Sequence, residues 1–182
     1  ASNRANTSVL TITVDTTVPA ANLNLPADET WTTSTTPTLS FNVTDNLDNV
    51  INYSIIIDGS VVNASWVTNN TEISHVLEVA LSEAVHSIVV ESMDEAGNRA
   101  NSSVVTLYVD ATNPQGEITS PSSGNTTDNT PTLVFNLTDN VDTALNYTVF
   151  INGNSANAGI AVNGTEETVG LGTLSDGSYT VV

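Results

Sequence analysis

An eleven-residue stretch occurs twice in this chain: TPTLSFNVTDN at Thr36–Asn46 and TPTLVFNLTDN at Thr130–Asn140. The copies differ at two positions and begin 94 residues apart, so they predict the same element in two successive units. In the first copy Leu39, Phe41 and Val43 alternate with polar residues, which is typical of a strand with one buried and one exposed face. An Asp-Asn pair ends each copy and favours a turn there.

A second pair of matching segments sets the unit boundaries. Residues 1–15 (ASNRANTSVLTITVD) match residues 96–110 (AGNRANSSVVTLYVD), and a short connector ending in proline follows each. The later copy closes a unit, so residues 1–15 are predicted to be the last strand of a preceding domain. Residues 16–110 then form a complete domain, and residues 111–182 form a domain that lacks its last strand.

Turn residues separate short segments of alternating polarity, and helical spacing is sustained nowhere. This pattern predicts an all-β sandwich of about seven strands per unit, with Tyr53 and Tyr147 in the two cores. The expected strands of the complete unit lie near residues 20–25, 38–44, 51–58, 61–67, 73–81, 85–92 and 101–109.

Val182 aligns with Val89 and Ala1 aligns with Ala96, so six residues separate the end of the sequence from a cyclic return to its start. Two interpretations are open. The chain is a window from a long covalent array of such units, or the first strand of one subunit completes the sandwich of the next, as in donor-strand assembly. Both interpretations predict a fibre built from copies of this unit.

The charge of the chain excludes some classes of partner. Twenty acidic residues face two basic ones, which gives a formal net charge of −18. Such a surface repels nucleic acid and anionic lipid and attracts cations. Cysteine is absent, so disulfides and thiolate metal sites are excluded, and no stretch approaches the roughly 18 apolar residues of a membrane span.

Four motifs occur in a fixed order and at consistent spacing within the repeat: the connector VDTTVP (Val14–Pro19), the TPTLSF strand, the LSDGSYTV corner (Leu174–Val181) and DEAGN (Asp94–Asn98) before the last strand. Together they resemble the tandem immunoglobulin-like domains of bacterial and archaeal surface proteins. The resemblance implies Greek-key sandwiches, with the first and last domains incomplete in this chain. It also implies an extracellular or cell-surface stalk, adhesin, surface-layer or filament component.

The chain departs from the antibody-type pattern, because the disulfide and the core tryptophan are absent. Tyr179 occupies the position of a tyrosine corner, whereas the first unit has His86 there.

Acidic residues are expected to meet at one pole of each sandwich, where the incoming connector and the loops after the second and sixth strands lie together. Carboxylate and amide oxygens are calcium ligands, so the sequence predicts an interdomain calcium site, with no cofactor required otherwise. The simpler alternative is that these residues form turns. The candidate ligands are Asp15, Asp45, Asp48, Asp94 and Asn98 for the first unit, and Asp110, Asp139 and Asp142 for the second.

Asn-x-Ser/Thr sequons predict N-linked glycans as partners of the chain. The alternative is that these asparagines are solvated polar residues of an exposed face. Asn42, Asn52, Asn136 and Asn146 have the outward parity of their strands, where a sugar could be accommodated. The ten candidates are Asn6, Asn42, Asn52, Asn63, Asn69, Asn101, Asn125, Asn136, Asn146 and Asn163.

Two further pairs occupy equivalent positions in the repeats. Arg4 and Arg99 are expected to pair with acidic groups, a structural role. Ile56 and Phe150 have outward parity, either as ordinary exposed residues or as lateral contacts of a filament.

The sequence does not predict an enzyme. It lacks the motifs of hydrolases, metalloproteases and phosphate loops, and His75 and His86 have no repeated partner. The main alternative to a structural repeat is a carbohydrate-binding or adhesive module, although the few aromatic residues provide little material for a sugar platform.

Overall fold

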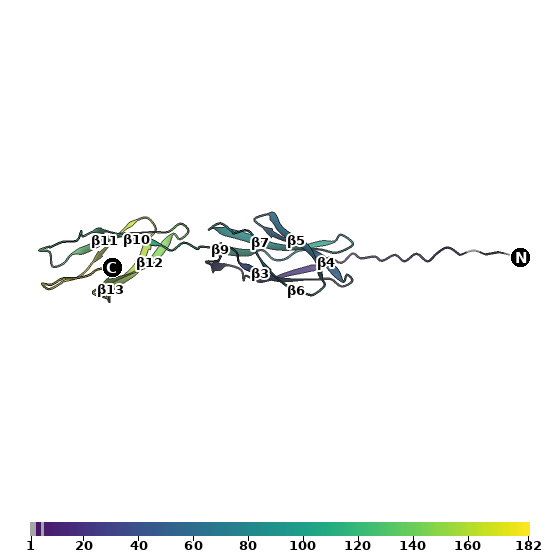
Figure 1. Ribbon diagram of the computed structural model, residues 1–182, viewed down its shortest axis with the longest axis horizontal. Helices are drawn as coiled ribbons and strands as arrows, with labels where there is room; N and C mark the ends of the chain where they lie inside the picture. The colour runs from purple at the N-terminus through teal and green to yellow at the C-terminus, as the bar shows by residue number, and fades with distance from the viewer. Residues whose placement is uncertain (1–2, 5) are drawn as a thin grey trace. The chain divides into compact units, whose positions relative to one another are not determined.

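A computed structural model describes residues 3–4 and 6–182, so residues 1, 2 and 5 of the predicted first strand lie outside the described residues. The chain divides into two compact units, unit 1 at Ala1–Val109 and unit 2 at Asp110–Val182 (Figure 1). The regular elements of both are β-strands, which confirms the predicted all-β fold class. Across the described part of the chain, we find no helix with the length and apolar character needed to cross a bilayer.

Unit 1 is a sandwich of two sheets. One sheet has the strand order β1-β3-β6, and the other has the order β2-β9-β7-β4-β5, with β8 paired to the far end of β7. The strands are β1 (Ala20–Leu25), β2 (Thr30–Thr32), β3 (Thr38–Thr44), β4 (Val50–Ile57), β5 (Ser60–Thr68), β6 (Glu72–Val76), β7 (Val85–Met93), β8 (Arg99–Asn101) and β9 (Val105–Val109).

The first copy of the repeated stretch forms β3, and its alternation is that of the core. Leu39, Phe41 and Val43 are fully buried, while the residues between them face outward. Phe41 meets Tyr53 of β4 edge to face, with ring centroids 4.9 Å apart, which confirms Tyr53 as a core residue. The strand therefore packs one sheet of the sandwich against the other.

Unit 1 differs from the expected strands in three places. The segment between the expected strands near 20–25 and 38–44 contains an additional strand, β2, which pairs in parallel with β9 and stacks Trp31 on Tyr108. The strand expected over residues 73–81 ends at Val76, and the next residue, Leu77, is buried and donates its amide N–H to the backbone oxygen of Pro37. The last strand is divided into β8 and β9 around Ser102, whose hydroxyl oxygen accepts a hydrogen bond from the backbone N–H of Val90.

Unit 2 repeats the beginning of this plan. Its sheets have the orders β10-β11-β14 and β12-β13, and an isolated bridge joins Ile151 to Val181. The second copy of the repeated stretch forms β11, and Phe135 meets Tyr147 with ring centroids 5.0 Å apart. The strands are β10 (Gln115–Ser120), β11 (Thr132–Thr138), β12 (Ala144–Ile151), β13 (Asn154–Val162) and β14 (Glu166–Gly170).

Candidate functional site

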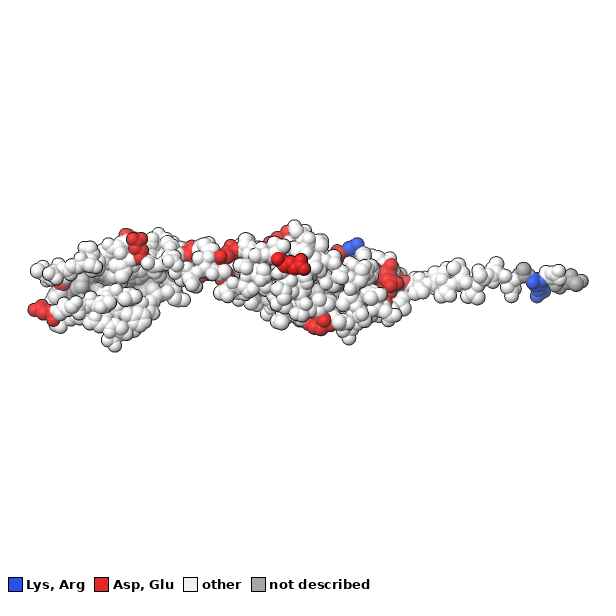
Figure 2. All heavy atoms as spheres, in the orientation of Figure 1, with Lys and Arg blue, Asp and Glu red and all other residues white. Residues whose placement is uncertain are grey.

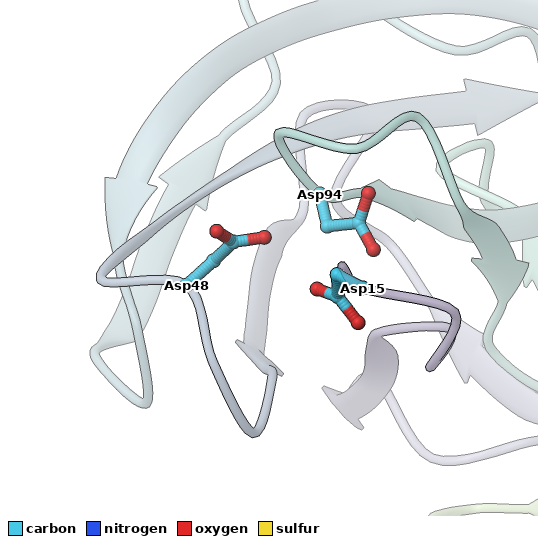
Figure 3. Close-up of side chains that lie close together, drawn as sticks. All are labelled: Asp15, Asp48 and Asp94. Carbon is cyan, nitrogen blue, oxygen red and sulfur yellow. The ribbon is translucent and has the colours of Figure 1, made fainter. Parts of the chain in front are cut away.

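Three carboxylates meet at one end of unit 1. Asp15 precedes β1, Asp48 lies in the β3–β4 loop, and Asp94 directly follows β7. One oxygen atom from each lies within 4.8 Å of the other two, and Figure 3 shows the three side chains directed toward one another. Three loops far apart in the sequence thus form one acidic cluster, which we call cluster 1.

Asp94 is the buried carboxylate of cluster 1, and its surroundings favour the charged form. Asp94 is only 1% exposed, and its oxygens accept hydrogen bonds from the backbone N–H and the side-chain amide of Asn98, at 2.8 and 2.7 Å. Burial acts to raise the pKa of Asp94, but the hydrogen bonds from Asn98, Gly97 and Ala96 outweigh it, and the pKa is lowered. Among the described residues, no hydrogen-bond partner reaches Oδ2 of Asp15. A cation at this point would offset the mutual repulsion of the carboxylates.

Two of the predicted ligands have other contacts. The Oδ1 atom of Asp45 accepts the amides of Leu47 and Asp48, at 2.8 and 3.1 Å, so this side chain forms the turn and lies outside cluster 1. Asn98 directs its side-chain NH₂ at Asp94 and at the backbone oxygen of Asp15. It therefore donates hydrogen bonds into cluster 1.

Unit 2 contains a corresponding acidic group, cluster 2. Oxygen atoms of Asp110, Asp139 and Asp142 lie within 4.8 Å of one another, and all three residues are half-buried. The pKa of Asp139 is lowered, chiefly by the backbone N–H groups of Asp142 and Val141. Clusters 1 and 2 share the connector position (Asp15 and Asp110) and one position of the following loop (Asp48 and Asp142), whereas the third carboxylate differs, Asp94 in cluster 1 and Asp139 in cluster 2. Figure 2 shows acidic side chains on the visible surface of both units.

An asparagine near the β5–β6 turn fastens the loop that carries Asp45 and Asp48. The Oδ1 atom of Asn69 accepts the amide of Asp45 at 3.2 Å, and its Nδ2 atom donates to the backbone oxygens of Asp45 and Asp48, both at 2.7 Å. Asn163 makes the same three contacts in unit 2. We call this arrangement the asparagine staple. Sequence reasoning missed it, although the 94-residue spacing of the two asparagines was the available signal.

The sequons differ in how free their amides are. Asn69 and Asn163 use both Nδ2 hydrogens in the staple, and Asn63 faces inward opposite Ile55 with a buried Oδ1. Asn42, Asn52 and Asn136 are half-buried on the outward side of their strands. The sequon asparagines with exposed side chains are Asn6, Asn101, Asn125 and Asn146.

The equivalent residues Arg4 and Arg99, and likewise Ile56 and Phe150, differ in their contacts or their exposure. Arg99 forms an ion pair with Glu91, whereas Arg4 lies exposed in the segment before β1. Ile56 is half-buried and Phe150 is exposed, both on outward-facing positions of their strands.

Unit 2 has an apolar groove of about 280 Å³ between its two sheets. In unit 1, Val90 and Ser92 of β7 pair with Ile55 and Tyr53 of β4 and are buried against the opposite sheet. The counterparts of Ile55 and Tyr53 in unit 2 line the groove, which therefore lies where β7 continues in unit 1. The apolar side chains of the lining include Ile118, Leu133, Phe135, Tyr147, Val149 and Val181.

Three solved structures are similar to this chain at low sequence identity. Fibronectin(III)-like modules of CbhA from Clostridium thermocellum are 11% identical, cover 89% of this chain and 83% of their own, and have a TM-score of 0.40. A 1.5-MDa bacterial ice-binding adhesin is 16% identical, with 86% of this chain and 55% of that chain covered and a TM-score of 0.35. The central fibronectin-III array of RIM-binding protein is 14% identical, with 90% and 56% covered and a TM-score of 0.34.

This chain spans about half the length of the solved adhesin chain and of the solved RIM-binding protein chain. No curated protein matches its sequence significantly. The family model of the bacterial Ig-like domain matches residues 24–111, which include β2 to β9 and the last two residues of β1. Unit 1 of this chain is accordingly a bacterial Ig-like domain.

Proposed function

We propose that this chain is a structural repeat segment of an extracellular surface stalk or filament protein. The observation that carries the proposal is that the same strand, asparagine staple and acidic cluster recur in two successive sandwiches. Each sandwich buries its own apolar cluster, so units can be added in series and length comes from repetition. The proposed role is mechanical and needs no catalytic group.

The test of this role is where the protein lies and how long its polypeptide is. Antibodies raised against unit 1 should label intact cells of the source organism, and immunogold should mark fibres or a surface coat. A denatured native polypeptide many times heavier than 19 kDa indicates a covalent array. Labelling that appears only after permeabilisation would contradict a surface role.

Calcium is the proposed ion of clusters 1 and 2. In cluster 1 the support is the convergence of three carboxylates, the buried Oδ2 of Asp15 and the lowered pKa of Asp94. Hard carboxylate oxygens suit calcium better than a transition metal. An ion bound there would join the segment before β1 to two loops of the sandwich and stiffen that end of the unit.

N-linked glycans are the proposed coat, carried by the exposed sequon asparagines Asn6, Asn101, Asn125 and Asn146. Glycosylation replaces one hydrogen of Nδ2, so it would remove a staple contact at Asn69 or Asn163. Secretion of the chain from an N-glycosylating host, followed by peptide mass spectrometry, should find sugar at Asn101 and Asn146 and none at the staple asparagines. The reverse distribution would contradict this assignment.

A β-strand is the proposed occupant of the groove in unit 2. Two sources meet this need: a continuation of the chain, or strand exchange with a neighbouring subunit. The segment before β1 suits exchange at the place of β9, which pairs with β7 in unit 1 and so lies beside the groove, because Leu10, Ile12 and Val14 are exposed and align with Val105, Leu107 and Val109, which are buried in β9. Sedimentation of the 182-residue chain separates these sources, since exchange gives head-to-tail oligomers and a chain that needs only its own continuation stays monomeric.

A carbohydrate-binding or adhesive module is the second candidate, and one observation favours it. Trp31 is 54% exposed and stacks on Tyr108 with ring centroids 4.6 Å apart, which places an aromatic pair at the edge of a sheet. A glycan array probed with the wild-type chain and with Trp31→Ala tests this role. Binding that depends on Trp31 would favour adhesion over a purely structural role.

A further inference from the structure

The corner where the chain enters β7 in unit 1 has an equivalent around Tyr179 in unit 2, with the same geometry but different side chains. In unit 1, Nε2 of His86 lies 3.0 Å from the backbone oxygen of Ser82. In unit 2, the hydroxyl of Tyr179 donates to the backbone oxygen of Ser175, also at 3.0 Å. The two side chains thus fasten equivalent loops, one through an imidazole and the other through a phenol.

A turn residue completes each corner. Oδ1 of Asp58 accepts the amide of Ser87 at 2.8 Å, and Oδ1 of Asn152 accepts the amide of Thr180 at 2.8 Å. Asp58 and Asn152 occupy the same left-handed turn position, with φ of 50° and 49°. The units differ at the second side-chain atom, because Oδ2 of Asp58 lies 2.7 Å from Nδ1 of His86.

The surroundings of His86 favour its charged form. Nδ1 faces a carboxylate oxygen of Asp58 and Nε2 faces the carbonyl oxygen of Ser82, and both of these atoms accept hydrogen bonds. A neutral imidazole has one N–H, so one nitrogen would turn a lone pair toward an acceptor; the hydroxyl of Ser82, 3.4 Å from Nε2, is the side-chain group that could then donate to that nitrogen. The His86 residue is 6% exposed, and water has little access to replace the lost contact.

The charges nearby act in the same direction. Burial lowers the pKa of His86, but the hydrogen bonds to Ser82 and Asp58 and the charge of Asp58 outweigh it and raise the pKa above its ordinary value. Burial raises the pKa of Asp58, but the hydrogen bonds from Ser87 and His86 and the charge of His86 outweigh it and lower the pKa. The other titratable groups on the loop before β7 and on β9 are Glu78, Glu83 and Tyr108.

We propose that the His86–Asp58 corner is a pH-sensitive lock of unit 1, which holds the loop before β7 to the β4–β5 turn while the imidazole is protonated and releases it on deprotonation. The corner of unit 2 is made by Tyr179 and Asn152, and it contains neither an imidazole nor a carboxylate. The two units therefore respond differently to the same change of pH.

The sign of the effect follows from linkage. The pKa of His86 is raised on folding, so its contribution is fully present below the unfolded value and is lost as the pH rises through the folded value. The pKa of Asp58 is lowered on folding, so its contribution is present above the unfolded value and is lost as the pH falls through the folded value. The lock is therefore tightest between the ordinary pKa values of the two groups, 3.8 and 6.5. Asp58 is half-exposed, so added salt weakens the lock.

Hydrogen exchange by NMR on the whole chain tests the lock at two matched amides, Ser87 and Thr180. After correction for intrinsic exchange, protection at Ser87 should fall on the order of tenfold as the pH rises through the titration midpoint of the His86 ring, because a hydrogen bond to a charged group is lost. Protection at Thr180 should stay constant over the same range. A His86 midpoint at or below 6.5, or equal pH profiles at the two amides, would overturn the proposal.

A paired substitution supplies the matched variant. Asp58→Asn with His86→Tyr installs the residues of unit 2 in unit 1, and protection at Ser87 should then become as independent of pH as protection at Thr180. Tyr179→Phe is the control, because it removes the corresponding hydrogen bond from unit 2 without involving a histidine. Retained pH dependence at Ser87 in the paired variant would overturn the lock, and if that variant does not fold, the wild-type profiles decide alone.

Discussion

Phe41 and Phe135 are the same residue of the same repeated strand, but they lie in different surroundings. In unit 1, Phe41 is fully buried within a core cluster to which β3, β4, β7 and β9 contribute. In unit 2, Phe135 packs on Tyr147 in a smaller cluster and lines the groove between the sheets. The two units thus share a local sequence and differ in what covers it.

The comparison separates what the repeat preserves from what it varies. The asparagine staple keeps its three contacts in both units, and the acidic clusters keep two of their three positions, one in the connector and one in the β3–β4 loop or its equivalent. The corner before β7 keeps its geometry but exchanges histidine for tyrosine. A backbone arrangement can therefore recur while the group that stabilises it changes charge.

The largest expected effect is a loss of stability on truncating the buried phenylalanine of each unit, Phe41 in the closed core of unit 1 and Phe135 beside the groove of unit 2. Phe41→Ala should destabilise unit 1 by about 3–5 kcal/mol, because it leaves a cavity in a packed core. Phe135→Ala should destabilise unit 2 by less, because the groove already deprives one side of that ring of partner atoms. Hydrogen exchange in denaturant on the whole chain reports each unit separately.

Phe150→Ala is the control for these substitutions, since this phenylalanine is on the outward face, and its effect should stay within about 0.5 kcal/mol. Equal losses from Phe41→Ala and Phe135→Ala would show that the groove has no energetic consequence.

Calcium should stabilise unit 1 through cluster 1 and unit 2 through cluster 2, and the two contributions can be measured separately. At a free concentration one hundred times its Kd, calcium should stabilise a unit that binds it by about 2.7 kcal/mol, and chelator should remove the gain. Asp94→Asn should abolish the effect in unit 1 and leave that in unit 2. Asp176→Asn, an exposed position outside both clusters, is the control for loss of charge. Melting curves that are identical with calcium and with chelator would eliminate the metal site.

Removing the asparagine staple should lower the free energy of unfolding by a similar amount in the two units. Asn69→Ala leaves one backbone N–H and two backbone oxygens of the β3–β4 loop without their partner, at an expected loss of about 2 kcal/mol. Asn163→Ala should cost unit 2 a similar amount. Asn49→Ala, a nearby exposed asparagine, should have little effect. A large difference between the two staple variants would mean that the repeat preserves the contacts but not their contribution to stability.

The smallest expected effect concerns the basic residues. Arg99→Ala should destabilise unit 1 by less than about 1 kcal/mol, because the Arg99 side chain in its pair with Glu91 is 55% exposed. The loss should shrink further in high salt. Arg4→Ala, at the equivalent position of the repeat, should leave the melting temperature unchanged. A salt-independent loss from Arg99→Ala would assign the residue a packing role instead.

Alternation within one strand was enough to predict β3 and β11, because strand parity depends only on neighbouring residues. The meeting of Asp15, Asp48 and Asp94 could also be predicted, since the topology of a Greek key brings those loops to one end. β2 could not be predicted, because three residues carry too little periodicity and its pairing partner is far away in the sequence.

The contacts that sequence reasoning missed join a turn to a distant side chain. Asn69 reaches a loop more than twenty residues earlier in the sequence, and Asp58 meets His86 across a comparable separation. Nothing in the local sequence distinguishes these residues from ordinary turn formers. Their equivalents in unit 2 appear only when the repeats are aligned and the folded contacts are compared.

The asparagine staple also bears on how such a protein ages chemically. Asn163 precedes Gly164, and deamidation at such a pair begins when the following backbone nitrogen attacks the side-chain carbonyl carbon. In the folded unit the side chain is fixed by three hydrogen bonds, and the nitrogen of Gly164 donates to the backbone oxygen of Leu137 at 2.8 Å. The folded state thereby keeps the two reacting groups apart. Aspartate or isoaspartate at this position would record that a molecule had spent time unfolded.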